Sequence, residues 1–203
     1  MKIICIGRNY AEHAKEMNAA VPSEPVFFLK PDTALIKDNQ PFYYPDFSKE
    51  IHHEVELVLK INKAGKNIAP EFAHKYYDEI GIGIDFTARD IQAKCKEKGL
   101  PWEKAKAFDG SAPIGDFVNK NEFKNLNDIS FHLTVNDKTV QRGNTKDLLF
   151  SFDTVVAYVS KFFTLKTGDL IYTGTPEGVG PVIVGDKLSA FIGDKKMLEF
   201  EIK

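Results

Sequence analysis

The chain has 203 residues, of which 43% are hydrophobic and 28% charged, a composition typical of a globular protein and not of a disordered one. Its 27 basic and 29 acidic residues give a formal net charge of -2, without the positive excess that general nucleic-acid binding needs. Two cysteines, Cys5 and Cys95, form no disulfide framework, and no apolar run approaches the roughly 18 residues of a transmembrane helix. We therefore expect one soluble, cytoplasmic domain, residues 1–203, with no nucleic-acid and no membrane partner.

Short strand-like runs separated by turns dominate the chain. In chain order, the predicted strands are Lys2–Ile6, Val26–Leu29, Glu54–Ile61, Ile80–Phe86, Ile129–Val135, Leu170–Thr173, Lys187–Phe191 and Met197–Ile202. Helical spacing of apolar residues is limited to Tyr10–Met17, Arg89–Lys98 and Leu148–Lys161. Strands and helices do not alternate regularly, which argues against a Rossmann or TIM layout and favours a β-rich α+β sandwich or roll with a few short helices. Asn136–Asp137 and Gly193–Asp194 are predicted to be hairpin tips.

The first predicted helix carries a histidine and a glutamate on one face. Asn9 is predicted to be its N-cap, with Glu12 at the third helical position. His13 and Glu16 are three residues apart and are therefore neighbours on the helix surface. A carboxylate that orients an imidazole fixes its tautomer and stabilises its charged form, so this pair is suited to general base catalysis. The alternative is an exposed contact on the helix surface.

The strand predicted at Glu54–Ile61 places two carboxylates on one face. Side chains alternate along a strand, so Glu54 and Glu56 point to one side while Val55 and Leu57 point to the other. On a half-buried sheet, two such carboxylates repel each other unless one is protonated or a cation lies between them. The alternative is an exposed strand face with two solvated acids.

A third acid ends the next apolar strand. Asp85 follows the apolar run Ile80–Ile84, which indicates a buried strand, and a buried carboxylate needs a partner. Thr87 is predicted to be the N-cap of the helix that follows. Three hard oxygen ligands suit Mg²⁺ or Mn²⁺, whereas zinc is disfavoured because no cysteine or histidine cluster accompanies them. Glu54, Glu56 and Asp85 are therefore candidate ligands of one divalent cation.

Polar residues further along the chain are placed to reach the same site. Arg89 and Gln92 share the first turn of the helix after Asp85 and can reach back toward it. The alternative is that both are polar residues on the exposed face of the helix. Lys106 is flanked by alanine and phenylalanine residues, which makes it a candidate for a buried ammonium. A Gly-rich turn near residue 175 lacks the P-loop pattern. It is either a tight turn between strands or a turn whose amides and Thr175 hydroxyl face an anionic ligand.

Together these segments resemble the fumarylacetoacetate hydrolase family, in particular its short single-domain acylpyruvase type. The matching segments are Gly7–Tyr10 with His13 and Glu16, Phe28–Pro31, Glu54–Leu57, Asp85–Asp90 with Gln92, Leu100–Trp102 with Lys106, Gly168–Asp169 and Thr173–Gly180. Each motif is weak alone, but their joint order is specific and spans essentially the whole chain. The fourth acidic metal ligand of the larger hydrolases is missing, which argues against fumarylacetoacetate itself as the substrate.

The resemblance implies a mixed β-sandwich roll with a few short helices, usually assembled as a homodimer. It implies that Mg²⁺ or Mn²⁺ is held by the residues that match the family's ligands, Glu54, Glu56 and Asp85. It also implies that His13 and Glu16 form a water-activating dyad on a segment that closes over the substrate.

The remaining matches to the family's functional residues concern the oxo-acid end of a small 2-oxo acid substrate, and they are Lys106, Arg89, Gln92 and Thr175. Cleavage of the C–C bond beyond the keto group of such an acid leaves an enolate whose negative charge a bound cation stabilises. We therefore predict a metal-dependent hydrolase that splits 3-acylpyruvates into pyruvate and a carboxylate. In that reaction His13 removes a proton from water and Lys106 supports the departing enolate. The alternatives are an oxaloacetate decarboxylase or tautomerase with the same metal site, and a non-catalytic module that binds metal and oxo acid.

Overall fold

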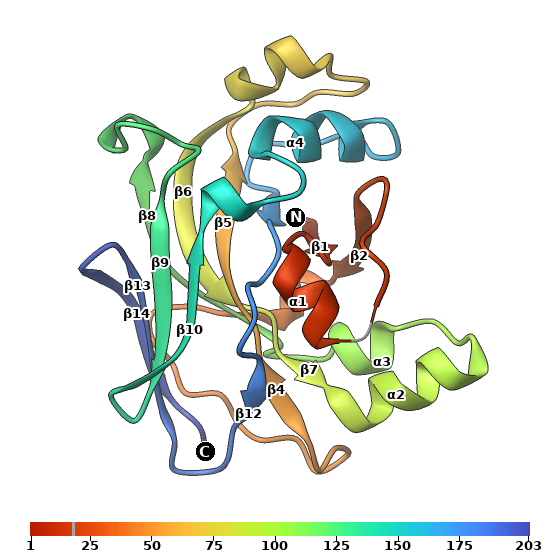
Figure 1. Cartoon of the computed structure of the whole chain (residues 1–203), viewed down its shortest axis with the longest axis vertical. Helices are drawn as coiled ribbons and strands as arrows, with labels where there is room; N and C mark the ends of the chain where they lie inside the picture. The colour runs from red at the N-terminus through yellow and green to blue at the C-terminus, as the bar shows by residue number, and fades with distance from the viewer. Residues whose placement is uncertain (18) are drawn as a thin grey trace.

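Strands make up most of the regular structure in this computed structural model, which describes residues 1–17 and 19–203 (Figure 1). The strands are β1 Ile3–Gly7, β2 Val26–Lys30, β3 Leu35–Ile36, β4 Ile51–His53, β5 Val55–Ile61, β6 Tyr77–Ile84, β7 Thr87–Ala88, β8 Ala112–Asn119, β9 Ser130–Val135, β10 Lys138–Asn144, β11 Leu170–Tyr172, β12 Gly180–Pro181, β13 Lys187–Ile192 and β14 Lys195–Glu201. The α-helices are α1 Ala11–Glu16, α2 Arg89–Lys98, α3 Glu103–Lys106 and α4 Phe152–Ser160. Short 3-10 helices span Asp32–Ala34, Pro70–Lys75, Lys120–Glu122 and Thr145–Asp147.

The largest sheet is mixed. Its strand order is β2-β1-β11-β5-β6-β8-β3, in which β1 runs parallel to β11 and β3 runs parallel to β8. An antiparallel sheet of order β10-β9-β13-β14 and a small sheet of order β12-β4-β7 accompany it. This arrangement confirms the predicted β-rich fold class. The predicted hairpin tips are also confirmed, since residues 136–137 connect β9 to β10 and residues 193–194 connect β13 to β14.

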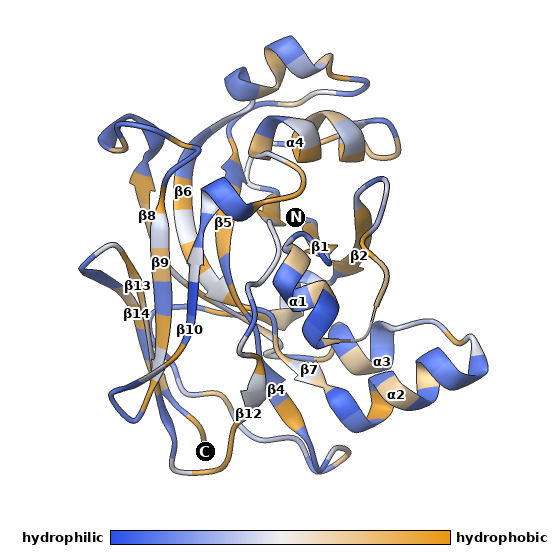
Figure 2. Ribbon diagram, in the orientation of Figure 1, coloured by the Kyte–Doolittle hydropathy of each residue, from blue (hydrophilic) through white to orange (hydrophobic). Residues whose placement is uncertain are grey.

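The core lies between the two larger sheets, where β13 and β14 pack against β6 and β8. Alternate residues of the central strands face opposite sides of the large sheet. Leu57 and Leu59 belong to the main hydrophobic cluster, whereas Val58 belongs to a smaller cluster with Cys5 and Tyr172. The period of two that the sequence predicted is therefore present, and it is visible along β9 in Figure 2.

One edge of the large sheet collects the chain segments that carry the predicted site. β1, β6 and β11 run in one direction and β5 runs in the other, because β1 is parallel to β11 and β5 is antiparallel to both of its neighbours. The residues that follow β1, β6 and β11 therefore meet the residues that begin β5. These segments contain His13, Asp85, Thr175 and Glu54 respectively.

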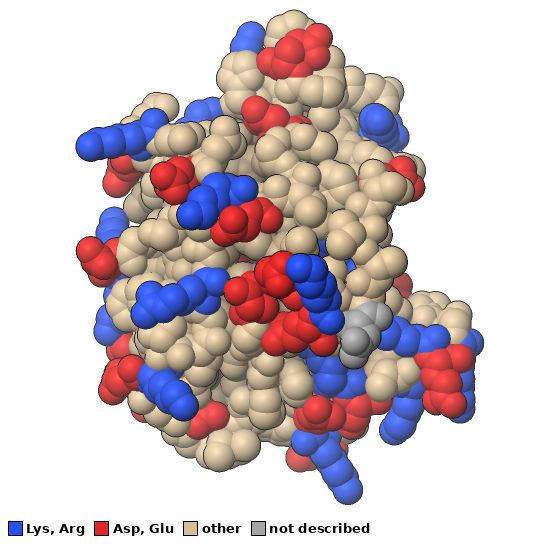
Figure 3. Space-filling model, in the orientation of Figure 1, with Lys and Arg blue, Asp and Glu red and all other residues tan. Residues whose placement is uncertain are grey.

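The helices cover this edge and the opposite one. Figure 1 shows α1 in front of β1, with α2 and α3 on the same side of the molecule. Helix α3 packs against α2, β2 and β7, whereas α4 packs against the 3-10 helix Pro70–Lys75 at the other edge. No helix among the described residues is long and apolar enough to cross a membrane. Acidic and basic side chains are intermixed on the face shown in Figure 3.

Three local predictions are wrong. Helix α4 begins at Phe152 and not at Leu148, because the preceding residues are extended: Leu148 bridges Tyr10, and Ser151 provides the N-cap by accepting a hydrogen bond from the Thr154 amide. Asn9 is not the N-cap of α1, since its side chain bonds the backbone of Phe150 and the Thr173 carbonyl instead.

The third wrong prediction concerns α2. Thr87 is not its N-cap, because Ala88 occupies that position and the Thr87 hydroxyl donates to Glu54 Oε1 at 3.0 Å.

The sequence analysis also did not predict strands β8 and β10. β8 contains a proline and a glycine and β10 is largely polar, so neither shows the apolar alternation on which the predictions depended.

Candidate active site

The three predicted metal ligands converge at the edge of the large sheet. Glu54 directly precedes β5, Glu56 is the second residue of β5, and Asp85 lies directly after β6. One carboxylate oxygen from each lies within 4.8 Å of the others. All three residues are at most 5% exposed, so the alternative of solvated acids is excluded for this structure.

Three cations hold two of these acids. The Lys106 ammonium lies 2.8 Å from both Glu54 Oε2 and Asp85 Oδ2. Lys30 lies 2.8 Å from the other Asp85 oxygen, and Arg89 donates to Glu54 Oε1 at 2.7 Å. Lys106 is 3% exposed, which confirms that it is the buried ammonium of its segment.

Lys30 is the residue that the sequence analysis missed. It ends the observed strand β2, one residue beyond the predicted strand Val26–Leu29, is 2% exposed, and also donates to the Ser111 hydroxyl and carbonyl. The sequence placed it in a family-like segment, Phe28–Pro31, but assigned it no role. The available signal was a lone lysine directly after four apolar strand residues, a position at which a charge needs a buried partner.

Glu56 differs from the other two acids because no ammonium or guanidinium contacts it among the described residues. Its Oε2 accepts a hydrogen bond of 2.7 Å from the Gly174 amide. Burial and the neighbouring Asp85 raise the pKa of Glu56 well above its ordinary value, and the Gly174 bond offsets only part of this. Glu56 therefore holds a proton or needs a further cation.

The other charges of the cluster respond to their partners. Burial alone would raise the pKa of Glu54, but Lys106 and Arg89 outweigh it and hold that pKa well below the ordinary value. Burial likewise opposes the charge of Lys106, yet Asp85 and Glu54 raise the pKa of its ammonium. Glu54 and Lys106 are therefore ionised at neutral pH.

The donor set fits a divalent cation. Carboxylate oxygens from two segments, residues 54–56 and Asp85, meet without a thiol, which matches the preference of Mg²⁺ and Mn²⁺ for oxygen ligands. The Lys106 ammonium bridges two of the three carboxylates, which shows that a positive charge is favourable between them. The raised pKa of Glu56 shows that a further positive charge is favourable there too.

The predicted dyad lies beside this cluster. His13 Nδ1 is 3.2 Å from Glu16 Oε2, and the other Glu16 oxygen accepts a bond of 3.0 Å from the Gly178 amide. His13 is 6% exposed, which excludes the alternative of an exposed helix contact. Glu16 thus connects α1 to the Gly-rich turn. The amides of Gly174 and Gly178 donate to carboxylates of the protein itself, so these two amides do not face a ligand, which was one of the two alternatives given for this turn.

The predicted substrate contacts also lie here. Arg89 Nη1 donates to Gln92 Oε1 at 2.7 Å, one turn further along α2. The Thr175 hydroxyl is buried and accepts a bond of 2.9 Å from Gln141 Nε2. Gln141, on β10, was missed, because no sequence pattern connects position 141 with the Gly-rich turn.

These residues surround one cavity of about 330 Å³. Eight of the nine predicted site residues line it, and they are His13, Glu54, Glu56, Asp85, Arg89, Gln92, Lys106 and Thr175. Glu16 does not line the cavity, but it contacts His13, which does. The cavity is at the small end of the range for ligand sites, which suits a substrate of a few carbon atoms.

Comparison with known proteins decides the family. The family model described as fumarylacetoacetate (FAA) hydrolase C-terminal matches residues 2–203. The chain belongs to the fumarylacetoacetate hydrolase family. An oxaloacetate tautomerase of Escherichia coli strain K12 is 46% identical over 93% of this chain and 86% of its own length. A mitochondrial oxaloacetate tautomerase of Mus musculus is 43% identical over 99% of this chain and 91% of its own length. The chain is therefore an enzyme of this family.

Solved structures share the whole fold. A fumarylacetoacetate hydrolase family protein from Yersinia pestis is 42% identical, with a TM-score of 0.95 over 100% of this chain and 93% of that one. A fumarylpyruvate hydrolase from Pseudomonas aeruginosa, solved with Mn²⁺ and pyruvate, is 37% identical, with a TM-score of 0.94 over 100% of this chain and 89% of that one. The fold and family predicted from the sequence are confirmed.

Glu56→Gln is predicted to stabilise the metal-free enzyme as the pH rises. Folding raises the pKa of Glu56 above its ordinary 4.5, so the folded chain retains a proton that the unfolded chain has lost. Stability therefore falls with rising pH from 4.5 up to the folded pKa, by at most about 1.4 kcal/mol per pH unit. Glutamine retains the acceptor for Gly174 and has no such dependence.

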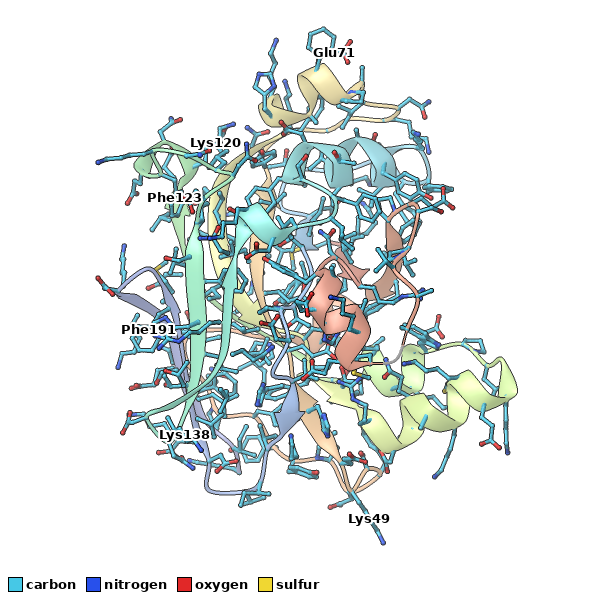
Figure 4. All side chains as sticks on the ribbon, in the orientation of Figure 1. Lys49, Glu71, Lys120, Phe123, Lys138 and Phe191 are labelled. Carbon is cyan, nitrogen blue, oxygen red and sulfur yellow. The ribbon has the colours of Figure 1, made fainter. Side chains whose placement is uncertain are left out.

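The measurement is thermal unfolding in EDTA between about pH 5 and about pH 8. The advantage of the variant over the native chain should grow across this range. Glu71→Gln, at the exposed outer edge labelled in Figure 4, is the matched control and should follow the native curve. A Glu56→Gln curve parallel to the native one would contradict the proposed protonation.

Proposed function

We propose that this enzyme catalyses the keto–enol tautomerisation of oxaloacetate with a divalent cation, Mg²⁺ or Mn²⁺, held by Glu54, Glu56 and Asp85. The sequence analysis gave this reaction as an alternative to acylpyruvate hydrolysis. Two relatives that are 46% and 43% identical carry the name oxaloacetate tautomerase, and they favour tautomerisation over hydrolysis as the main reaction.

The charge of the buried cluster carries the proposal. When a metal ion displaces the Glu56 proton, the three ionised carboxylates face three cations, Lys30, Arg89 and Lys106, and these six side chains are formally neutral. A divalent cation bound there leaves two uncompensated positive charges in a low-dielectric site. A substrate that brings two negative charges neutralises them. Oxaloacetate, with two carboxylates, meets this requirement.

Two more cations stand at the cavity and favour a dicarboxylic acid. Arg8 and Lys96 both line it, and neither forms an ion pair with an acid in the described part of the chain. Partial burial lowers the pKa of Lys96, and the positive charges of the neighbouring Arg89 and Lys106 lower it further. Arg8 has a φ of 57°, a left-handed conformation that costs energy for a non-glycine residue. An anionic group of the substrate relieves this concentration of positive charge.

Tautomerisation moves one proton between C3 and the keto oxygen of oxaloacetate. A bound divalent cation supplies Lewis-acid stabilisation of the negative charge that develops on the oxo-acid end. His13 exchanges the C3 proton at Nε2, which makes no hydrogen bond within the described residues, while Glu16 holds Nδ1. Glu16 stabilises the imidazolium that forms when Nε2 takes the proton.

The remaining residues bind and orient the oxo acid. Arg89 and the Gln92 amide lie side by side on α2 and offer donors to the C1 carboxylate. Thr175 approaches from the Gly-rich turn with its hydroxyl. The Lys106 ammonium lines the cavity and would donate a hydrogen bond to the keto oxygen, which stabilises the enolate. The proton that His13 takes from C3 is then delivered to that oxygen, which completes the enol.

Acylpyruvate hydrolysis is the second candidate. The His13–Glu16 dyad supports it, because a histidine held by a carboxylate activates water as readily as it removes a carbon-bound proton. The resemblance to a fumarylpyruvate hydrolase at 37% identity supports it as well.

The homodimer and the cytoplasmic location expected from the sequence stay predictions; the Mus musculus relative is named as mitochondrial.

Removal of the metal and loss of the His13–Glu16 dyad are predicted to affect activity and metal binding differently. In EDTA, or after Glu54→Gln, metal-dependent interconversion of the oxaloacetate enol and keto forms should be lost, because the ligand set is incomplete. His13→Gln should retain metal binding but lower the rate by about 10²–10⁴-fold, the usual contribution of a general base. The ultraviolet absorbance of the enol reports the reaction, and Glu71→Gln is the control variant.

Full activity in excess EDTA would contradict the metal requirement. The same preparation is assayed with acetylpyruvate for release of pyruvate. If the enzyme turned over acetylpyruvate faster than oxaloacetate, hydrolysis would be the main reaction and the proposed tautomerisation would not.

Lys96→Met is predicted to weaken recognition of dicarboxylic acids selectively. The KM for oxaloacetate should rise about threefold to tenfold, as for loss of an exposed ion pair of about 1 kcal/mol. The KM for acetylpyruvate, which lacks the second carboxylate, should stay unchanged. Lys98→Met, in the last turn of the same helix, is the matched control. An equal rise in both KM values would contradict a role for Lys96 at the second carboxylate.

A further inference from the structure

Gln141 connects the four-stranded sheet to two parts of the site. It lies on β10, is 1% exposed, and forms four hydrogen bonds with its side-chain amide. Its Oε1 lies 2.9 Å from His53 Nδ1 and accepts a bond of 3.0 Å from the Val55 amide. Its Nε2 donates to Thr175 Oγ1 at 2.9 Å and to the Pro176 carbonyl at 3.0 Å.

The orientation of this amide is fixed at both ends. The Val55 N–H can only donate, so the Gln141 oxygen must face it. The Pro176 carbonyl can only accept, so the Gln141 NH₂ group must face that side. The reversed amide would place two donors together at Val55 and two acceptors together at Pro176. Since Oε1 faces His53, the proton of that imidazole must lie on Nδ1.

This orientation determines the role of the Thr175 hydroxyl. One lone pair of Thr175 Oγ1 is occupied by the Gln141 N–H, so the hydroxyl cannot donate its own proton in that direction. No residue in the described part of the chain accepts that proton. Thr175 is 3% exposed and lines the cavity. The free proton is therefore available to an acceptor inside the cavity.

The turn that carries Thr175 packs closely on β10. A Cβ added to Gly178 would lie 2.4 Å from the Val140 carbonyl, so the turn has no space to move toward the strand. At its other end Gln141 holds Val55, the residue between the acids Glu54 and Glu56. One side chain therefore fixes the Gly-rich turn relative to the acidic strand.

We propose that Gln141 is a positioning residue that directs the Thr175 hydroxyl proton at a carboxylate oxygen of the bound 2-oxo acid. The identity of this ligand rests on the proposed function, whereas the orientation of the hydroxyl rests on the four bonds of Gln141. Gln141 does not touch the substrate. It acts through Thr175, because its N–H donates to one lone pair of the hydroxyl oxygen and so restricts the rotation of the hydroxyl.

A double-mutant cycle on pyruvate binding tests this proposal. Pyruvate is titrated calorimetrically into the Mn²⁺-loaded enzyme and its variants. Gln141→Met and Thr175→Val should each raise the dissociation constant about tenfold, as expected for one hydrogen bond to a charged group. In the Thr175→Val background, Gln141→Met should change it by less than about twofold, because no hydroxyl remains to be oriented. Thr175→Ser should bind pyruvate as the native enzyme does.

A Gln141→Met effect of the same size in both backgrounds would overturn the proposal, because it would show a general structural role. Thr139→Val, on the same strand, is the control for disturbance of β10. In steady-state assays with oxaloacetate, Gln141→Met should raise KM more than it lowers kcat. A loss confined to kcat would also overturn the proposal.

Nitrogen NMR of His53 in the native enzyme gives a measurement that needs no variant. The proposal requires a proton on Nδ1, and a bare Nδ1 would overturn it because the Gln141 amide would then be reversed. Failure of the proposed function has a different signature. An enzyme that binds pyruvate and shows the coupled loss, yet does not act on oxaloacetate, would reject the function and retain the role of Gln141.

Discussion

Three buried carboxylates within 4.8 Å of one another are the constraint on which the rest of the site depends. Ionised acids at this separation, out of contact with water, are tolerated only with matching cations and hydrogen bonds. Lys30 and Lys106 meet this need for Asp85, and Lys106 and Arg89 meet it for Glu54. Loss of one partner from such a pair typically costs about 3–5 kcal/mol, so the two buried lysines support the fold as well as the site.

The sheet topology explains how distant segments supply this cluster. Parallel and antiparallel pairings of β1, β11, β5 and β6 bring three strand ends and one strand start to a single edge. The small sheet of β12, β4 and β7 then leads into α2, which adds Arg89 and Gln92. Glu56 remains without a cationic partner among the described residues, and this asymmetry marks where an additional positive charge is needed. Under the proposed function, a divalent cation supplies this positive charge, and the carboxylates of a dianionic substrate offset the excess positive charge that then results.

Much of the site could be predicted from the sequence because its residues leave local signals. Asp85 directly after an apolar strand, and two glutamates alternating with Val55, conflict with the polarity expected of their positions. Such conflicts are typical of functional sites. Lys30 gave a weaker signal, since one lysine at a strand end is also common at a surface. Gln141 gave none, because its four partners come from β4, β5 and the turn after β11, and only the packed sheets bring them together. The same limit explains Asn9 and Thr87, whose side chains were expected to cap helices and instead bond groups distant in the sequence.

Titration of the enzyme with Mn²⁺, followed by electron paramagnetic resonance of the free ion, tests most directly whether the carboxylate cluster is a metal centre. The native enzyme should bind one Mn²⁺ per chain, Mg²⁺ should displace it, and Asp85→Asn should abolish this binding. Binding of Mn²⁺ that is unchanged by Asp85→Asn, or no binding at all, would contradict the account.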